Sequence, residues 1–247
     1  MKNILWTGGW DSTFRVLELA IVKKEIVQPY YILDNERESS QQEQNAMKKI
    51  KELMTEKFPH TTDAIKELII ISKSDIPPNA TITRDFNRLL SKSYLGPQYE
   101  WLGRYADASG LSDLELCIHR DDKATNFLHS SVKKADDEND SYDVLDLENM
   151  TYPELSLFKY YRFPILRLTK VQMHEIAMKY GFDDIMEHTW FCHHPRNDGS
   201  PCGLCNPCKY TRSEGLGRRV PKPTVFQFAG YYCKRALKKL KDLCGRD

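Results

Sequence analysis

The residues best suited to chemistry near the start of the chain are Asp11 and Ser12, which follow the glycine pair Gly8 and Gly9. The apolar run at residues 3–5 precedes them, which predicts a strand, a tight loop and then a helix. Asp and Ser favour helix starts, and glycines leave backbone N–H groups uncovered. Such a loop attracts anions, above all phosphate. It is not the GxxxxGK[ST] loop, because no lysine follows the second glycine.

A second group of reactive side chains lies near the C-terminus. Thiolates two residues apart can wrap one zinc ion, and four of them leave no position for water, so the metal would be structural. His193 or His194 could replace one thiolate. A disulfide pair and an iron–sulfur cluster are the alternatives. The four predicted ligands are Cys192, Cys202, Cys205 and Cys208.

The overall charge balance argues against partners that bind through a large surface of one charge. Lys and Arg number 36 and Asp and Glu number 35, so neither nucleic acid nor a membrane surface is an expected partner. No apolar run reaches the length of a membrane span, and no signal-peptide core is present, so we expect a cytoplasmic protein with reduced thiols. The length favours an α/β domain at residues 1–188 and a small module at residues 189–247.

Alternating patterns in the first half predict strands and helices in turn. Strands are expected at residues 27–33, 68–71 and 114–118, and the fully apolar run at 68–71 is typical of a buried strand. Helices are expected between them, one of them starting near Pro97 and ending at Gly110. This order predicts an α/β fold with a doubly wound parallel sheet, and ligands bind at the carboxyl edge of such sheets.

Two further segments carry local signals. Residues 133–149 are charged and non-periodic, which predicts a solvated loop. Thr169 and Gln172 form a capping-box pattern for a helix closed by Gly181. The expected apolar stripe of that helix is Val171, Ile176, Ala177 and Tyr180.

The first motif resembles the SGGxDS signature of the PP-loop ATP pyrophosphatases, with Thr7 where serine is usual. Those enzymes bind ATP on this loop and split it between the α- and β-phosphates to form an adenylate. The resemblance implies ATP contacts from Trp6, Thr7, Gly8, Gly9, Trp10, Asp11, Ser12 and Thr13, and we expect Asp34 and Arg37 on the same edge.

The two motifs together resemble the 7-cyano-7-deazaguanine synthases, known as QueC. Residues 189–192, 202–208 and 215–216 look like the family's T-x-x-C, CGxCxxC and GL pattern, and Pro164 and Ile165 lead to Lys170 as in its PL…K segment. The resemblance implies an adenine-nucleotide-hydrolase-like fold with a zinc module. The implied reaction converts the carboxylate of 7-carboxy-7-deazaguanine into a nitrile, using ATP and ammonia.

The middle of the chain departs from that family. Its PGRN-type segment appears as residues 96–101 without Arg-Asn, and its Asp-Cys-Arg-type segment is replaced by residues 118–123. A conjugating enzyme of an antiviral defence system, which joins a deazaguanine to a protein amine, is therefore an alternative. A tRNA-modifying PP-loop enzyme and a non-catalytic nucleotide-binding subunit are the others. The expected substrate contacts are Gln98, Tyr99, Trp101, His119, Arg120 and Asp121, although Tyr99 and Trp101 could equally belong to the core.

The expected catalytic residues are Asp11, Ser12 and Lys170. Asp11 either holds Mg²⁺ or caps the helix, and Lys170 either neutralises phosphate or is a solvated surface residue. The basic, aromatic stretch at residues 231–241 favours a packed amphipathic helix over nucleic-acid contact. The expected partners are a small deazapurine, a protein acceptor in the conjugating alternative, and a second copy of the chain in a homodimer.

Overall fold

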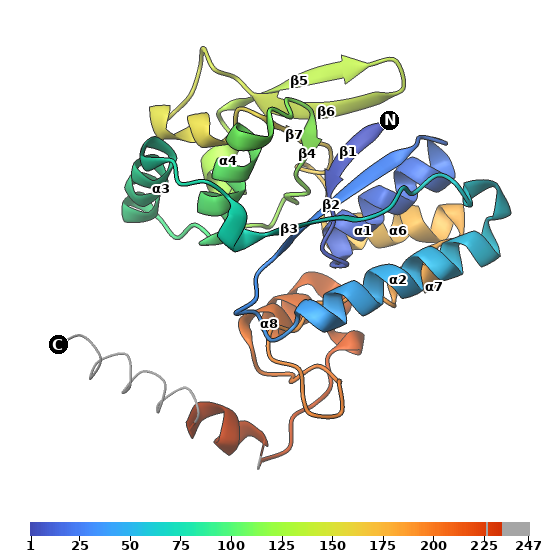
Figure 1. The fold of residues 1–247 in the computed structure, drawn as a ribbon. Helices are drawn as coiled ribbons and strands as arrows, with labels where there is room; N and C mark the ends of the chain where they lie inside the picture. The colour runs from blue at the N-terminus through green and yellow to red at the C-terminus, as the bar shows by residue number, and fades with distance from the viewer. Residues whose placement is uncertain (226, 234–247) are drawn as a thin grey trace. The chain divides into compact units, whose positions relative to one another are not determined.

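The computed structural model describes residues 1–225 and 227–233, and the chain forms two units, Met1–Trp190 and Phe191–Asp247. The larger unit is built on a seven-stranded sheet in the order β3-β2-β1-β4-β7-β6-β5 (Figure 1). In chain order the strands are β1 (Lys2–Leu5), β2 (Val27–Leu33), β3 (Ile69–Ser72), β4 (Leu114–Glu115), β5 (Val132–Asp137), β6 (Asp140–Leu145) and β7 (Tyr161–Phe163).

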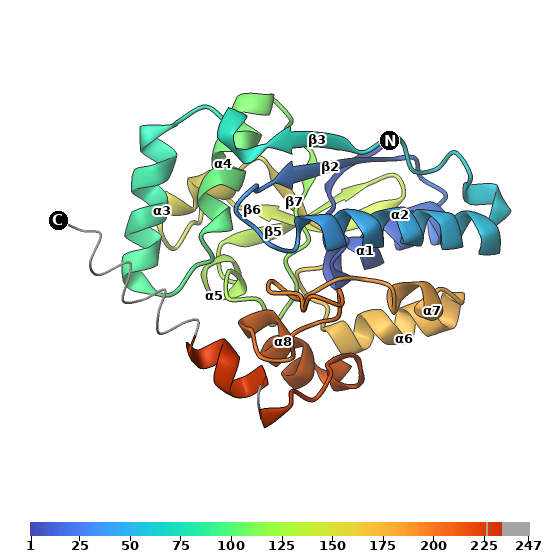
Figure 2. The ribbon, with the colours of Figure 1, turned by 60° about the horizontal axis from the view of Figure 1, so that its bottom comes forward.

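Helices cover both faces of this sheet, which confirms the predicted α/β fold. The neighbouring strands from β3 to β7 run parallel, and only the β5–β6 hairpin adds antiparallel pairs. Helices α1, α2, α6 and α7 lie on one face, and α3 and α4 lie on the other (Figure 2). The helices are α1 (Trp10–Leu17), α2 (Ser40–Lys57), α3 (Ala80–Lys92), α4 (Gln98–Ser109), α5 (Thr125–Leu128), α6 (Lys170–Tyr180), α7 (Asp183–Met186) and α8 (Asn206–Thr211).

The ends of the helices follow the sequence signals closely. Helix α4 starts after Pro97 and ends at Gly110, which adopts φ 68°. Helix α6 has the predicted capping box, in which Thr169 and Gln172 bond reciprocally, and it ends at Gly181 with φ 73°. Both glycines take the left-handed conformation that other residues rarely adopt, so the turns there depend on them.

The predicted apolar stripe of α6 is wrong in part, since only Ala177 of its four residues is buried. Val171 and Tyr180 are exposed, whereas Met173 and Ala177 are buried. Lys170, Met173 and Ala177 follow the i, i+3, i+7 spacing of one helix face. This face packs inward and carries Lys170, which lies 3.8 Å from the carboxylate of Asp11. The sequence pattern weighted only apolar residues and so missed this face.

The predicted loop at residues 133–149 is also wrong, because most of it forms the hairpin β5–β6. Strand β5 shows no apolar alternation: Lys133, Lys134, Asp136 and Asp137 are all exposed. It is the outermost strand on its side of the sheet. Charged side chains are typical of edge strands, because they prevent pairing with a further strand. They also remove the apolar alternation by which a strand is predicted from sequence.

At the opposite edge, the predicted buried strand at residues 68–71 is β3, and it is not buried. Ile69 and Ile70 are 42% and 48% exposed, because β3 has a neighbouring strand on one side only. The expected strand at 114–118 is shortened to β4, Leu114–Glu115. The smaller unit contains the cysteine loop and α8.

Much of the predicted C-terminal helix at residues 231–241 lies outside the described residues. Among the described helices, none combines the length and the apolar composition that a membrane span requires.

A buried ion cluster joins α1 to the sheet. Arg15 is 1% exposed and donates to both carboxylate oxygens of Glu115 on β4, from Nε at 2.7 Å and from Nη2 at 2.8 Å. It also bonds Glu18 at 2.7 Å and Asp140 on β6. A bidentate ion pair of this kind is strong. Loss of one partner is strongly destabilising, because the other charge then stays buried and unpaired.

We expect Arg15→Met to lower the free energy of unfolding by about 3–5 kcal/mol, because it leaves the carboxylate of Glu115 buried and unpaired. Urea unfolding followed by circular dichroism measures the change. The matched control is Lys57→Met, which removes the exposed ion pair with Asp184 at 2.8 Å and should change the free energy by less than about 1 kcal/mol. Equal effects of the two substitutions would contradict this account.

Candidate functional site

Three loops converge at the carboxyl ends of the parallel strands. Asp11 follows β1, His119 follows β4 and Lys170 follows β7. The last two loops are tied together by the N–H of Arg120, which donates to the carbonyl of Leu168 at 2.9 Å. Strands β1 and β4 are neighbours from which the chain departs in opposite directions along the sheet, and such a switch point forms the ligand crevice of doubly wound folds.

The side chains of these loops meet around one carboxylate. Asp11 Oδ2 lies 3.4 Å from His119 Nδ1 and 3.8 Å from Lys170 Nζ. The side chains of His119 and Lys170 are only 5% and 13% exposed, so Lys170 is not a solvated surface residue. Burial alone would raise the pKa of Asp11, but Lys170 and His119 together lower it below its ordinary value. Asp11 is therefore an anion held between two basic groups.

The other oxygen of Asp11 is better placed for a metal than for the helix backbone. Helix α1 begins with Gly9 as its N-cap, and no side chain caps it, so the capping alternative for Asp11 is not observed. Within the described residues, Asp11 Oδ1 is buried and has no hydrogen-bond partner. A buried carboxylate oxygen without a partner suits a hard divalent cation such as Mg²⁺.

The glycine loop before α1 is sterically constrained. Gly8 adopts φ 68°, and a Cβ at this position would lie 2.7 Å from the carbonyl oxygen of Glu43. Its own carbonyl accepts from the N–H of Trp190 at 2.8 Å. Ser12 Oγ accepts from the N–H of Thr7 at 3.3 Å and lies 3.4 Å from its hydroxyl. These contacts fix the conformation of the loop. The first N–H groups of α1 lie at its end.

Two of the residues expected at the ATP edge already have partners inside the chain. Asp34 accepts from Lys73 Nζ at 3.1 Å, and Arg37 Nη1 lies 3.2 Å from Glu43 Oε1. Glu43 is 5% exposed and also accepts from Tyr31 at 2.8 Å. Sequence reasoning did not single out Lys73 or Glu43. The sequence could have indicated Lys73, because this residue directly follows β3 and therefore lies at the same edge of the sheet.

The expected substrate residues divide into buried and exposed groups. Tyr99 is 5% exposed, and its hydroxyl donates to Asp122 at 3.1 Å. Burial and the nearby Asp122 raise the pKa of Tyr99 well above its ordinary value. Arg120 and Asp121 are exposed and 3.9 Å apart. Gln98 is half-buried, and Trp101 is half-buried against the core.

Tyr99 and His119 are brought together through the segment after β4. The N–H of Asp122 donates to the carbonyl of His119 at 3.1 Å, so the residue that bonds Tyr99 is anchored to the residue that faces Asp11. Trp101, Arg120 and Asp121 stay predictions as substrate contacts.

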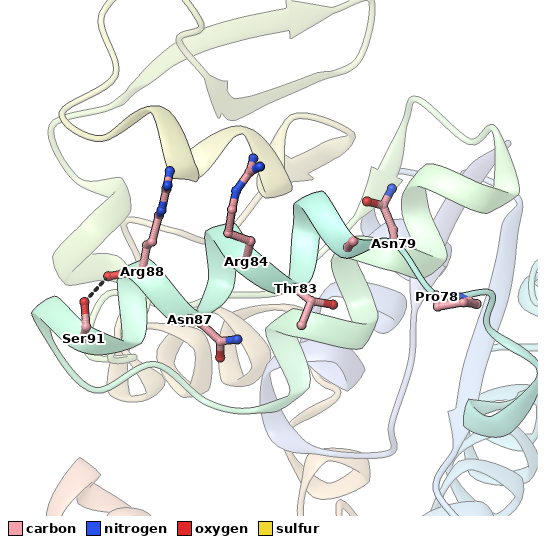
Figure 3. Close-up of a pocket in the computed structure, with 8 residues that line it drawn as sticks. Pro78, Asn79, Thr83, Arg84, Asn87, Arg88 and Ser91 are labelled. Atoms are coloured by element: carbon pink, nitrogen blue, oxygen red, sulfur yellow. Dashed lines mark hydrogen bonds between the residues drawn. The ribbon is translucent and has the colours of Figure 1, made fainter.

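A separate groove lies on the exposed face of α3 (Figure 3). It contains none of the residues expected to bind ATP or substrate, and the Ser91 hydroxyl in it bonds back to the carbonyl of Arg88 at 2.7 Å. Its arginines are both partnered by carboxylates, Arg84 by Asp85 and Arg88 by Glu154. The groove therefore adds nothing to the cluster around Asp11.

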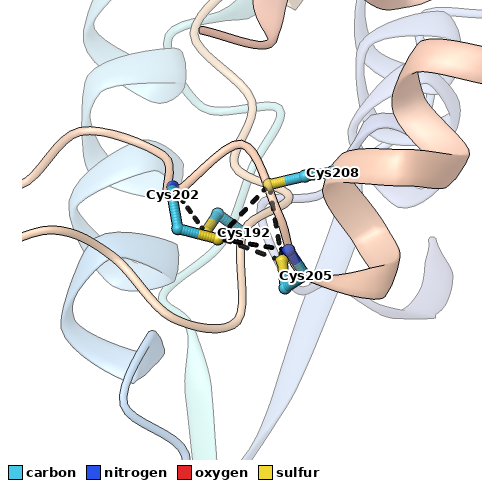
Figure 4. A group of neighbouring side chains, drawn as sticks. All are labelled: Cys192, Cys202, Cys205 and Cys208. Carbon is cyan, nitrogen blue, oxygen red and sulfur yellow. Dashed lines mark hydrogen bonds between the residues drawn. The ribbon is translucent and has the colours of Figure 1, made fainter. Parts of the chain in front are cut away.

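The four predicted cysteine ligands form one cluster in the smaller unit (Figure 4). All are buried, and their sulfur atoms lie within 4.8 Å of one another. The Sγ–Sγ distances include 3.4 Å for Cys205–Cys208 and 3.8 Å for both Cys202–Cys208 and Cys192–Cys205. A tetrahedron with zinc–sulfur bonds of ~2.3 Å has edges of roughly 3.8 Å. Disulfides need about 2.05 Å, so these distances fit a Cys₄ zinc module and exclude disulfide pairs among these four.

Backbone N–H groups point at the sulfurs. The N–H of Cys202 donates to Cys192 Sγ at 3.2 Å, and those of Leu204 and Cys205 donate to Cys202 Sγ at 3.4 and 3.3 Å. Such bonds stabilise thiolates and orient them toward a shared metal. The donor set of four buried sulfurs fits a closed structural site.

Comparison with known proteins places this part of the chain. Residues 155–219 match the family of queuosine biosynthesis protein QueC. This segment is QueC-like. A 7-cyano-7-deazaguanine synthase from Rhizorhabdus wittichii is 36% identical over 64 residues, 26% of this chain and 26% of that protein. One from Cupriavidus pinatubonensis is 33% identical over 66 residues, 27% of this chain and 28% of that protein.

The chain matches about a quarter of the length of these relatives. The QueC-like segment is residues 155–219. It includes Lys170 and all four cysteines, whereas Asp11 and His119 lie outside it. The match therefore supports the resemblance in the second half of the chain. The first half rests on its own motif and on the geometry described above.

We expect the purified protein to contain about one zinc per chain, because four buried thiolates complete a tetrahedral shell. Elemental analysis by mass spectrometry measures the metal. Cys205→Ser should lower both the zinc content and the melting temperature, whereas the control Cys233→Ser, at an exposed thiol outside the cluster, should retain zinc. A metal-free protein, or a coloured preparation containing iron and sulfide, would overturn the zinc assignment.

Proposed function

We propose that the chain uses ATP to activate the carboxylate of a deazapurine acid as an adenylate, which ammonia or an amine then attacks. The observation that carries this proposal is the meeting of Asp11, His119 and Lys170 at the carboxyl ends of β1, β4 and β7. The QueC-like segment, which contains Lys170, supports the deazaguanine class of substrate.

Activation addresses a chemical difficulty of carboxylates, which are poor electrophiles because oxide is a poor leaving group. Attack of a carboxylate oxygen on the α-phosphorus of ATP breaks the bond from that phosphorus to the bridging oxygen, releases pyrophosphate and gives a mixed anhydride. Attack of an amine nitrogen on its carbonyl carbon then releases AMP, and the nitrogen loses a proton. The protein must hold the triphosphate, offset charge on the departing pyrophosphate and align the acid with the α-phosphorus.

Residues of the larger unit suit each task. The N–H groups of the Gly8–Gly9 loop and of the first turn of α1 can cradle phosphate oxygens. The Ser12 hydroxyl oxygen accepts from the N–H of Thr7, and its hydrogen can donate to a phosphate. Lys170 Nζ, 3.8 Å from Asp11, can offset charge on the departing pyrophosphate.

The proposed metals have separate duties. Asp11 Oδ1 is the oxygen that would hold Mg²⁺, which would supply additional positive charge to the phosphates. The four cysteines would hold Zn²⁺ in a structural role, since they leave no ligand position for substrate.

The accepting amine distinguishes two versions of the proposal. In the synthase version the acceptor is ammonia, and the resulting amide oxygen is activated by a second ATP, so that loss of this oxygen with AMP leaves a nitrile. In the conjugating version the acceptor is a protein amine, as in a QueC-like defence enzyme. The second version is favoured by the segments at residues 96–101 and 118–123, which lack the Arg-Asn and Asp-Cys-Arg elements of the synthases. His119 occupies the second of these segments and faces Asp11.

Removing the charge of Asp11 or Lys170 should lower AMP formation by about 10²–10³-fold, the usual effect of losing one preorganised electrostatic group. The variants are Asp11→Asn and Lys170→Met, assayed with ATP, Mg²⁺ and 7-carboxy-7-deazaguanine. Lys179→Met, on the same helix as Lys170 but at an exposed position, is the matched control and should retain activity. Wild-type turnover in Asp11→Asn would remove this loop from the mechanism, provided that its circular dichroism spectrum is unchanged.

Product masses should separate the two versions. We expect incubation with ATP, Mg²⁺ and 7-carboxy-7-deazaguanine to yield AMP in either case, because both share the activation step. With ammonium, release of free nitrile supports the synthase version. A stalled amide, or a protein mass increased by the acyl group, supports the conjugating version. If no deazapurine acid yields AMP or an adenylate, both versions are wrong.

A further inference from the structure

The helix formed by residues 225 and 227–233 is almost entirely exposed (the red helix in Figure 1). A capping box starts it: Thr224 Oγ1 accepts from the N–H of Gln227 at 3.3 Å, and the Gln227 side chain accepts from the N–H of Thr224 at 2.9 Å. Of the described residues from Thr224 to Cys233, all but Tyr231 are exposed. Helices gain most of their stability by packing an apolar face, so this helix is suited to a further surface.

One face of this helix is apolar. Val225, Phe228 and Tyr232 follow i, i+3, i+7 spacing and are 83%, 51% and 42% exposed. The rings of Phe228 and Tyr232 lie 4.6 Å apart. The sequence that follows continues the same spacing with Ala236, Leu240 and Leu243. An exposed apolar face of this length is typical of an interaction site.

The charge of this region is strongly positive, which the near-neutral total of the chain conceals. Residues 217–247 contain nine Lys and Arg but only two Asp and no Glu, so their net charge is +7, against +1 for the whole chain. The rest of the chain therefore carries a net negative charge. Such asymmetry is typical of a segment that binds an anionic surface. The overall balance, which argued against a membrane surface as a partner, does not describe this region.

The sequence places cations beside the apolar face. In a helical projection of the sequence, five cations flank the apolar residues on both sides: Lys234, Arg235, Lys238, Lys239 and Lys241. A nucleic acid would use the cations but not a continuous apolar face. A second copy of the segment would be repelled by the same positive charge. An anionic bilayer uses both features, because apolar side chains enter the acyl boundary while cations on either side reach the head groups.

We propose that residues 224–243 bind the surface of an anionic lipid bilayer as an amphipathic helix. Phe228 and Tyr232 enter the boundary between head groups and acyl chains, and the cations contact the anionic head groups. A helix of this kind lies in the plane of the interface and does not span the bilayer.

Sedimentation of the full chain with lipid vesicles tests the proposal. Vesicles of phosphatidylcholine containing about one third phosphatidylserine should bind the protein at least ~10-fold more tightly than vesicles of phosphatidylcholine alone. Sodium chloride at about 0.5 M should release most of the bound protein, because it screens the attraction between the cations and the head groups.

Two pairs of substitutions separate the apolar contribution from the electrostatic one. Phe228→Gln combined with Tyr232→Gln should weaken binding to the anionic vesicles by at least ~10-fold without changing the charge. The matched control is Leu90→Gln combined with Tyr94→Gln, at apolar side chains of the larger unit that are 42% and 60% exposed, and it should bind as the wild type does.

The cations are tested in the same way. Lys238→Gln combined with Lys239→Gln should weaken binding by about 10–30-fold. Lys48→Gln combined with Lys49→Gln removes two adjacent exposed lysines of α2 and should leave binding unchanged.

Three results would overturn the proposal. The first is equal binding, or no binding, to the neutral and the anionic vesicles. The second is wild-type binding by the Phe228→Gln and Tyr232→Gln variant, which would show simple charge attraction. The third is tighter binding to a labelled transfer RNA than to the anionic vesicles, which would make nucleic acid the partner. None of these readouts involves ATP, so failure of the membrane proposal leaves the proposed function unaffected and the reverse also holds.

Discussion

The buried pair between Arg15 and Glu115 is the interaction on which the geometry of the larger unit depends. Arg15 lies four residues after Asp11 on α1, and Glu115 lies four residues before His119 on β4. Joining these two side chains therefore fixes the elements from which Asp11 and His119 project. Because Arg15 also bonds Asp140, the same cluster attaches the β5–β6 hairpin to the sheet. A buried guanidinium with three carboxylates demands this arrangement, since any of them left alone would be a buried unpaired charge.

The cluster around Asp11 shows how a parallel sheet assembles residues far apart in the chain. More than fifty residues separate Asp11 from His119, and His119 from Lys170. Each of the three nevertheless follows a strand of the same sheet by only a few residues. Neighbouring parallel strands end at one edge, so their loops meet there. The bond from Arg120 to Leu168 then sets the spacing between the last two loops.

The sequence predicted the parts of the molecule that depend on local chemistry. The glycine loop, the capping box at Thr169 and the ends of α4 follow from the conformational preferences of single residues, and the cysteine cluster follows from ligand spacing. It did not predict the β5–β6 hairpin, because the charged residues that protect an edge strand remove the alternation by which strands are found. Nor did it predict the exposure of Ile69 and Ile70, since an apolar run does not reveal the position of its strand in the sheet.

For the candidate site, the sequence placed Asp11 and His119 at the same carboxyl edge of the sheet and assigned Lys170 to the phosphates, but it did not predict the direct contacts of Asp11 with His119 and Lys170. It also missed Arg15, Glu43 and Lys73, because a charged residue that is buried in a pair looks the same in a sequence as a solvated one. Lys170 illustrates the difference: its place in the first turn of a helix is typical of solvent exposure, but its partner, Asp11, lies more than 150 residues earlier in the chain.

The position of Lys170 has a consequence for how fast a polyanion is captured. As the first residue of α6, it adds a full positive charge to the positive end of a helix dipole, and its contact with Asp11 brings it beside the N-terminal end of α1. The chain as a whole carries a net charge of only +1. Beyond the screening length of ~8 Å in physiological salt, an approaching triphosphate therefore meets an almost neutral surface. Long-range steering of the triphosphate of the proposed function would therefore be weak, so encounter rates should depend little on ionic strength.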